Sequence, residues 1–415
     1  MALLVIAAVC LLASWLQACS AGFHFRQLGS ISITDPSFVR VLQCGSATSP
    51  SLWITEFSGG LDKPGKVYTV ANVTSFYPDF SVAKPILVSS DFKWPNRISV
   101  APKEIGDYLV VPDGFLVPGK STGGIFLLNC DLQRDVEHSL KPIELTSPKL
   151  GWFHHMVVWR DMNGDGRLDI LTARATKPII GDAGGQLMWL EQPAENPLTS
   201  VPWKEHVLAS GPDVIIVMAD FNDTDKQFEI FACEFFSERL SVLTISTTDA
   251  TVTGTRDIDT TIGPAYDAIL VDLNMDGSED LLVTNHKGGN GGEVYAYEIP
   301  KNVMTGNYTK HLIASNFTVT EPGSHQAAPG FVYAFKPNSS YTGKPFILIA
   351  GDGSQKAYVL QPTDKDFVYS VSVLLSVSGV VGSIGLANLI GPEEAVEFFV
   401  PDYDENRLYA FTMGT

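Results

Sequence analysis

The chain has 415 residues, and its 46 acidic side chains outnumber its 28 basic ones, which gives a formal net charge of −18. A surface this acidic disfavours nucleic acid and anionic membranes as partners. Hydrophobic residues make up 45% of the chain and charged residues only 18%, which is typical of a packed globular protein rather than a disordered one.

The N-terminal segment predicts secretion. Residues 1–20 hold no charged side chain and carry a long apolar run, and the small residues Ala18, Ser20 and Ala21 offer a cleavage site. The alternative, a membrane anchor, lacks a flanking basic residue to hold the run in place. We expect a signal peptide over residues 1–20 and a secreted, extracellular chain over residues 21–415, with a single domain and no membrane span.

Three cysteines remain after removal of the predicted signal peptide, so one disulfide and one free thiol are expected. Cys233 lies in the apolar segment Ile230-Phe-Ala-Cys and is predicted to be a buried thiol. The favoured pairing is therefore Cys44 with Cys130, although sequence alone leaves the other two pairings open.

Five sequons of the type N-x-S/T predict N-glycosylation in a secreted chain. They begin at Asn72, Asn222, Asn307, Asn316 and Asn338.

Short apolar segments recur along the chain, and each is followed, after a turn, by another short strand-like segment. Seven such segments are predicted to be the second strands of successive repeats: 52–55, 108–111, 169–172, 229–232, 280–283, 346–349 and 397–400. Runs with helical period are lacking. Short strands that repeat in this way predict an all-β chain folded as a seven-bladed β-propeller, because ring closure leaves no long exposed sheet edge.

Two loops carry oxygen-bearing side chains at positions 1, 3, 5 and 9, with a backbone carbonyl available at position 7. Hard cations such as Ca²⁺ take six to eight oxygen ligands, and neither loop contributes a histidine. We expect two structural calcium sites. Their predicted ligands are Asp161, Asn163, Asp165, Arg167 and Asp169 in the first loop, and Asp272, Asn274, Asp276, Ser278 and Asp280 in the second.

A degenerate copy of the loop starts at Asp220, between the two intact ones. Its third position is Asn222, which also begins a sequon, so a glycan there would disfavour ion binding.

These loops resemble the calcium loop D-x-D/N-x-D-G-x-x-D of FG-GAP (VCBS-type) repeats in integrin-like β-propellers. The resemblance implies that each calcium loop joins the first and second strands of a blade. The segment Trp152-Phe-His154-His155-Met-Val-Val-Trp159 is also similar, more weakly, to channel strands of secreted aldos-2-ulose dehydratase-type propellers. That similarity implies a metal-dependent sugar reaction.

In a propeller, the starts of first strands and the ends of second strands reach the same face, here called the top face. The predicted calcium loops would lie on the opposite face. Histidines and an arginine at top-face positions are candidates for transition-metal binding or acid–base catalysis at the channel mouth. They are His154, His155, Arg174, His286 and His325. In the alternative interpretation, these groups hydrogen-bond to one another and to water in a polar channel.

Two functions remain open. The first is a calcium-stabilised propeller that binds an extracellular glycan, small molecule or protein on its top face. The second is a secreted metal-dependent sugar lyase or isomerase that acts at the channel mouth through clustered histidines. The sequence contains no G-x-S-x-G, so a serine hydrolase of the nucleophile-elbow type is not supported.

Overall fold

The computed structural model describes residues 23–60, 63–117, 120–131, 139–178, 180–221, 226–321 and 326–414. The predicted signal peptide, Asn222 and His325 lie outside these ranges.

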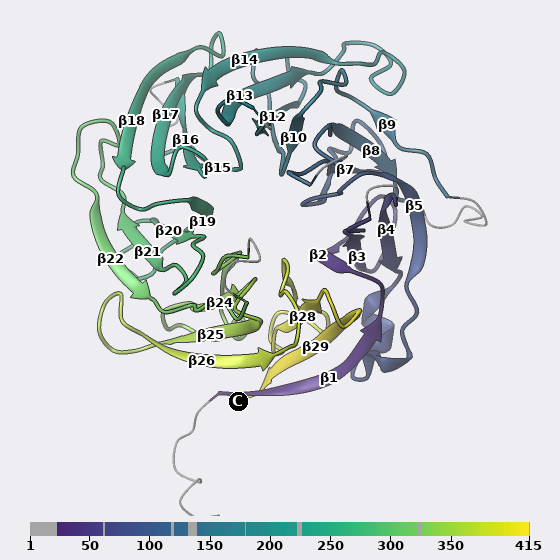
Figure 1. Ribbon diagram of the computed structural model, residues 1–415, viewed down its shortest axis with the longest axis vertical. Coiled ribbons are helices and arrows are strands. Elements are labelled where there is room, and N and C mark those ends of the chain that lie inside the picture. The colour runs from purple at the N-terminus through teal and green to yellow at the C-terminus, as the bar shows by residue number, and fades with distance from the viewer. Residues whose placement is uncertain are drawn as a thin grey trace, which may run out of the picture.

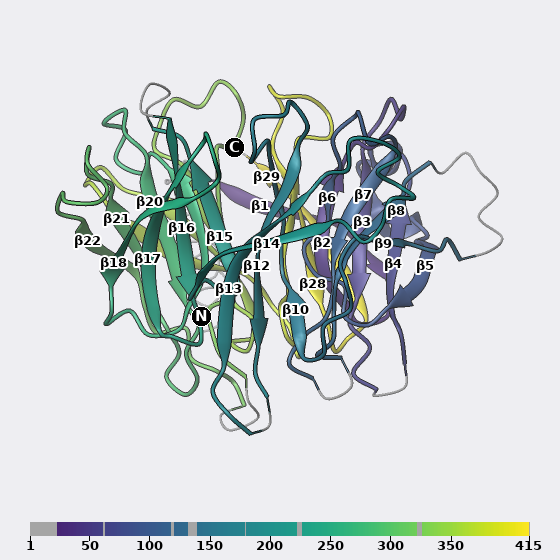
Figure 2. The ribbon, with the colours of Figure 1, turned by 90° about the horizontal axis from the view of Figure 1, so that it is seen from above.

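Seven antiparallel sheets form a ring around a central channel, which confirms the predicted seven-bladed β-propeller (Figure 1). Seen from the side, the sheets stand next to one another around the ring (Figure 2). The first four blades contain β2 (Pro36–Leu42), β3 (Ser51–Glu56), β4 (Gly65–Val70) and β5 (Ile86–Phe92); β6 (Ser99–Val100), β7 (Tyr108–Pro112), β8 (Ile125–Asn129) and β9 (Ile143–Glu144); β10 (Trp152–His154), β11 (Val158–Arg160), β12 (Asp169–Thr176), β13 (Gly184–Glu191) and β14 (Lys204–Ser210); and β15 (Ile215–Ala219), β16 (Gln227–Glu234), β17 (Arg239–Ser246) and β18 (Val252–Asp259).

The remaining three blades complete the ring. They contain β19 (Ala265–Val271), β20 (Asp280–Asn285), β21 (Val294–Glu298) and β22 (Thr309–Ala314); β23 (Val332–Phe335), β24 (Phe346–Ala350), β25 (Lys356–Pro362) and β26 (Tyr369–Ser376); and β27 (Gly385–Ala387), β28 (Glu397–Asp402), β29 (Arg407–Gly414) and β1 (His24–Ser32). In the described residues, helix is limited to two short 3₁₀ segments, η1 (Val73–Phe76) and η2 (Phe80–Val82).

The N-terminal strand closes the ring. β1 pairs antiparallel with β29 and supplies the outer strand of the seventh blade (Figure 1). A strand from the start of the chain thus joins three strands from its end, so the first and last blades are held together by a backbone ladder.

The predicted second strands are β3, β7, β12, β16, β20, β24 and β28, and they lie inside the blades. All residues of β20 and β24 are buried. Their continuous apolar character follows from this position, since both faces of the strand pack against neighbouring blades. Fully burying one such Leu, Ile or Phe side chain stabilises the fold by about 1.5–3 kcal/mol.

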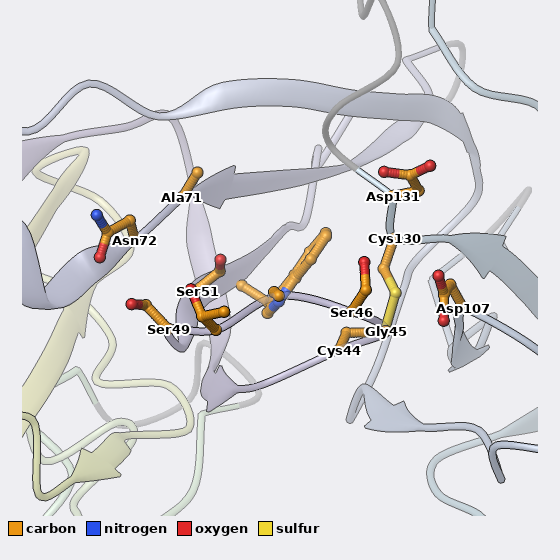
Figure 3. A pocket seen from close by; sticks show the side chains of 13 residues that line it. Cys44, Gly45, Ser46, Ser49, Ser51, Ala71, Asn72, Asp107, Cys130 and Asp131 are labelled. Atoms are coloured by element: carbon orange, nitrogen blue, oxygen red, sulfur yellow. A yellow bond between two sulfur atoms is a disulfide. The ribbon is translucent and has the colours of Figure 1, made fainter.

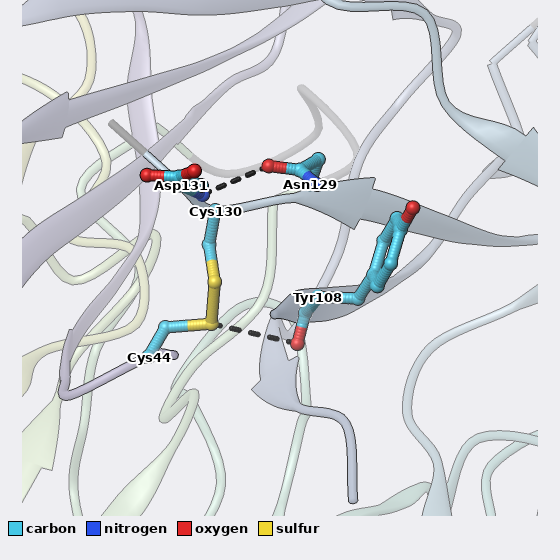
Figure 4. Close-up of a disulfide and its surroundings, with 5 residues drawn as sticks. All are labelled: Cys44, Tyr108, Asn129, Cys130 and Asp131. Atoms are coloured by element: carbon cyan, nitrogen blue, oxygen red, sulfur yellow. Dashed lines mark hydrogen bonds between the residues drawn. A yellow bond between two sulfur atoms is a disulfide. The ribbon is translucent and has the colours of Figure 1, made fainter. Parts of the chain in front are cut away.

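The predicted disulfide is confirmed. Cys44, in the loop after β2, is bonded to Cys130, just after β8, with the two Cα atoms 6.2 Å apart (Figure 4). It joins the first and second blades, and its presence indicates an oxidising compartment, extracellular or periplasmic. Cys233 is a buried free thiol, as predicted. No helix in the described ranges is long and apolar enough to cross a membrane.

Candidate functional site

The starts of the inner strands and the ends of the second strands enclose a pocket of about 450 Å³ on the top face, at the mouth of the channel. It is referred to below as the top-face pocket. Seven of its sixteen lining residues are Phe, Tyr or Trp: Phe38, Phe57, Trp94, Phe115, Tyr266, Phe331 and Tyr403. Its polar lining residues include Ser37, Asn96, His155, Gln326, Asp352 and Ser383.

The aromatic side chains form one connected wall. The rings of Trp94 and Phe115 are stacked, with centroids 5.8 Å apart and an interplanar angle of 14°. The Phe57 ring also contacts Trp94, with centroids 4.5 Å apart. The His155 ring meets Phe115 edge-on, with centroids 5.4 Å apart. These rings come from the first three blades, so the packing of consecutive blades brings them together.

Three polar atoms of the pocket residues have no hydrogen-bond partner in the structure: Trp94 Nε1, Asn96 Oδ1 and Gln326 Oε1. A buried polar group without a partner costs about 1–3 kcal/mol, and native proteins rarely leave one. The aromatic wall, together with polar lining residues such as Ser37, His155 and Asp352, suits a ligand that has both hydroxyl groups and an apolar face.

Below the pocket, an ion pair crosses the channel. Arg97, before β6, reaches Asp267 on β19 with Nη2–Oδ1 at 3.0 Å, and both side chains are largely buried. Burial alone would lower the pKa of Arg97, but the Asp267 carboxylate outweighs this and raises it. Asp267 also accepts a hydrogen bond from the Val332 backbone N–H at 3.0 Å.

The predicted histidines occupy different surroundings. His155 lines the top-face pocket. His286 borders it, with Nε2 3.1 Å from Asp352 Oδ2 and its ring stacked on Tyr266 at 4.5 Å. His154 instead faces the interior of the third blade, where its Nδ1 lies 3.5 Å from Thr172 Oγ1.

Arg174 is held within the third blade. It donates through Nε and Nη2 to Gln186 Oε1 and through Nη1 to Glu205 Oε2 at 2.8 Å. The structure thus brings His155 and His286 to the pocket and places His154 and Arg174 elsewhere in the same blade. His325 lies outside the described residues.

His154 and His155 are both neutral at physiological pH. Burial lowers the pKa of His154 to about 3, with Arg174 and His155 adding to the effect. Burial, and then the charge of Arg97, lowers the pKa of His155 to about 3 as well. Neutral, buried imidazoles of this kind serve as hydrogen-bonding and packing groups more readily than as proton carriers near pH 7.

The channel histidines do not form a metal-ligand set. Within the ranges that the structure describes, no three His, Cys, Asp or Glu side chains are grouped so that they could hold a metal ion. The residues described at the channel mouth therefore do not fit a transition metal, whose sites draw three or four such ligands together.

The two predicted calcium loops lie between first and second strands, from β11 to β12 and from β19 to β20, on the face opposite the pocket. In both loops, the position-5 backbone N–H donates to the position-3 Asn side chain at 3.0 Å. The position-9 carboxylates, Asp169 and Asp280, each accept the backbone N–H of position 2 at 3.0 Å.

The oxygen donors of these loops are of the type that a hard cation takes, although the structure does not group three of the described carboxylates of either loop around one point. In the second loop, burial and then the nearby Asp276 and Asp272 carboxylates raise the pKa of Asp280 to about 7. The donors are carboxylate and amide oxygens, and the carbonyls of Arg167 and Ser278 lie at position 7. A bound Ca²⁺ would be held by these residues and would offset the crowded negative charge.

A second pocket, of about 330 Å³, lies beside the disulfide on the face of the calcium loops (Figure 3). It lies between the first two blades, and Trp53 contributes a buried Nε1 with no partner to its lining. The exposed sequon residue Asn72 stands at its edge (Figure 3). Of the other sequons, Asn307 and Asn316 are exposed and Asn338 is half-buried.

The fold and the pocket together define a seven-bladed β-propeller with an aromatic top-face pocket. No protein-family model matches the sequence, and no curated protein matches it. Among solved structures, a chain of the S. cerevisiae complex of Dbp5 with Nup159, Gle1, IP6 and ADP aligns over 95% of this chain and 96% of its own, with 12% identity and a TM-score of 0.49.

Two bacterial structures also align with this chain. The Pseudomonas aeruginosa periplasmic gluconolactonase PpgL covers 88% of each chain with 14% identity and a TM-score of 0.49. The calcium-binding protein regucalcin from Agrobacterium tumefaciens covers 79% of this chain and 85% of its own, with 12% identity and a TM-score of 0.41. The fold assignment rests on the sheet topology itself, and the FG-GAP resemblance of the two loops stays a prediction.

Sequence reasoning missed the aromatic wall. Phe57 directly follows the second strand β3, Phe115 lies in the loop after the second strand β7, and Trp94 lies in the segment before the first strand β6. These are the same top-face positions that singled out the histidines. The signal was present, but only polar residues were considered as candidates.

Proposed function

We propose that this protein is a secreted, calcium-stabilised β-propeller that binds an extracellular glycan by taking a terminal, uncharged sugar into the top-face pocket. The observation that carries the proposal is the aromatic wall with polar side chains in the same lining at the channel mouth.

The chemistry of the pocket supports a sugar ring. A hexose has apolar C–H faces that pack on aromatic rings, and hydroxyl groups that donate and accept hydrogen bonds. Trp94 and Phe115 offer ring faces, while Ser37, His155 and Asp352 bring polar groups to the lining. Small-ligand sites combine mostly apolar walls with a few placed polar groups in this way, at volumes of about 300–1,000 Å³.

Charge supports a neutral ligand. Arg97 follows the pocket residue Asn96, and its guanidinium is already paired with Asp267. Asp352 contributes a carboxylate to the wall, and the whole chain carries a net charge of −18. An acidic sugar would meet repulsion without a free cation in the pocket to offset it.

The enzymatic alternative has one observation in its favour. His286 and Asp352 form a hydrogen-bonded pair at the edge of the pocket, at 3.1 Å, and such a pair is able to move a proton. His155 is neutral and packed against rings, so among the described members of the predicted set no second acid–base group faces this pair. Binding is therefore the better-supported function.

The test is a glycan array probed with the labelled mature protein and with its Phe115→Ala variant. We expect selective binding to neutral glycans that share a terminal sugar, and loss of that binding in the variant. The exposed residue Leu150, which is 89% exposed, supplies the control variant Leu150→Ala. Equal array binding by wild type and Phe115→Ala, or no selective binding at all, would overturn the proposal.

A further inference from the structure

A further cavity, of about 300 Å³, is lined mainly by residues of the inner strands β2, β19, β23 and β27. It is referred to below as the lower cavity. Its lining is aliphatic apart from one tyrosine and one arginine: Arg40, Val41, Ile269, Val332, Tyr333, Ala334, Ile384 and Leu386.

The arginine of this cavity is half-buried and has no ion-pair partner of its own among the described residues. Arg40 lies on β2, and among the described residues no carboxylate forms an ion pair with it and no side-chain hydrogen bond holds its guanidinium. Arg97 offers the contrast, because it lies nearby in the same channel and is paired with Asp267 at 3.0 Å. Two arginines thus share one carboxylate, which leaves one positive charge in excess.

The surroundings make that charge costly. Burial lowers the pKa of Arg40, and the like charge of Arg97 lowers it further. Tyr333 does not compensate, because its hydroxyl is already engaged with Ser383 Oγ at 2.8 Å and the Ile384 N–H at 2.8 Å. A buried, unpaired charge is rare in proteins because desolvation is expensive, and a partner of opposite charge is the usual remedy.

We propose that the lower cavity binds a small organic carboxylate, with its carboxylate paired to Arg40 and its short hydrocarbon part against the aliphatic wall. The guanidinium presents a planar fork of donors that matches a carboxylate with two parallel hydrogen bonds. Ile269, Val332 and Leu386 provide the apolar surface that a hydrocarbon chain needs and that an inorganic anion would not use. This site is separate from the top-face pocket and does not depend on the function proposed for it.

The test measures the melting temperature of the dialysed, full-length mature protein in butyrate, acetate and chloride at matched ionic strength. Butyrate should raise the melting temperature with increasing concentration, because a ligand that binds only the folded state stabilises it by mass action. Acetate should raise it less and chloride least. In the Arg40→Gln variant, the affinity for butyrate should fall by about tenfold or more, since the charge-assisted hydrogen bonds are lost.

A matched arginine variant, the melting temperature without ligand and a crystal soak complete the test. Arg26, exposed on the outer strand β1, supplies the matched variant Arg26→Gln, which should respond to butyrate as wild type does. Without ligand, Arg40→Gln should melt no lower than wild type, because it removes an uncompensated charge. Crystals soaked in 4-bromobutyrate should show the bromine signal in the lower cavity. An equal response to butyrate and chloride, an unchanged response in Arg40→Gln, or no bromine in the cavity would overturn the proposal.

Discussion

Arg97 and Asp267 join the second and fifth inner strands across the channel, with Nη2 and Oδ1 3.0 Å apart. The guanidinium also lies over the Phe331 ring, 5.1 Å from its centroid. The carboxylate has a further partner in the Val332 N–H. One ion pair therefore links opposite sides of the ring.

The two partners of this ion pair should not contribute equally to stability. Asp267→Asn leaves Arg97 and Arg40 together without a carboxylate, whereas Arg97→Met leaves Asp267 with Arg40 still nearby. We expect Asp267→Asn to lower the free energy of unfolding by about 3–5 kcal/mol, and Arg97→Met to lower it less. Urea denaturation of both variants and of the double variant measures this. Equal losses, or a larger loss for Arg97→Met, would show that Arg40 does not share the carboxylate.

Calcium removal should destabilise the fold. A cation held by the two loops stabilises the folded chain by mass action, so the melting temperature should drop in EDTA and recover with added Ca²⁺. Asp276→Ala should melt lower than wild type in calcium and respond less to EDTA. Asp182→Ala, at an exposed position outside the loops, is the control. A wild-type melting curve that is the same in EDTA and in calcium would contradict the role of the loops.

Cys233 should be unreactive in the folded protein. Its thiol is buried, and burial, followed by the nearby Asp267 and Asp213, raises its pKa well above the usual value. The nucleophilic thiolate is therefore scarce at neutral pH. Iodoacetamide should modify Cys233 only after denaturation, and mass mapping without reduction should recover Cys44 linked to Cys130. Rapid labelling of Cys233 in the native protein would be inconsistent with its buried position.

Glu397 should make stability depend on pH. It is buried, accepts the Leu389 N–H at 2.8 Å, and burial raises its pKa to about 7. The unfolded chain releases this proton with a pKa of about 4.3, whereas the folded chain keeps it to higher pH. The free energy of unfolding should therefore fall as pH rises from about 4 to 7. Glu397→Gln should lessen this fall, whereas Glu195→Gln, at an exposed position, should not. An identical slope in wild type and Glu397→Gln would rule out this contribution.

The sequence pattern was most informative where structure depends on local chemistry. The apolar second strands follow from burial on both faces, and the Cys44–Cys130 pairing followed from the apolar surroundings of Cys233. Closure by β1 was not predicted, because a strand at residue 24 pairs with one ending at residue 414, and no local signal records that choice.

The candidate site was predicted only in part, for a geometric reason. Successive residues of an extended strand point to opposite faces, so neighbours such as His154 and His155 do not reach the same pocket. Arg174 pairs with His154 in the ladder and is held by Gln186 and Glu205 instead. Which of two adjacent residues faces the channel depends on register, and register is set by the assembled blade.

The central claim is that the top-face pocket binds a neutral terminal sugar through its aromatic wall. Isothermal titration of the array-selected oligosaccharide into wild type and Trp94→Ala tests it most directly. We predict one site per chain in wild type, and in the variant an affinity lower by about tenfold or more, which corresponds to ~1.4 kcal/mol, with little change in melting temperature. Equal affinities for the two proteins would contradict the account, because the ligand would then bind without the wall that defines the pocket.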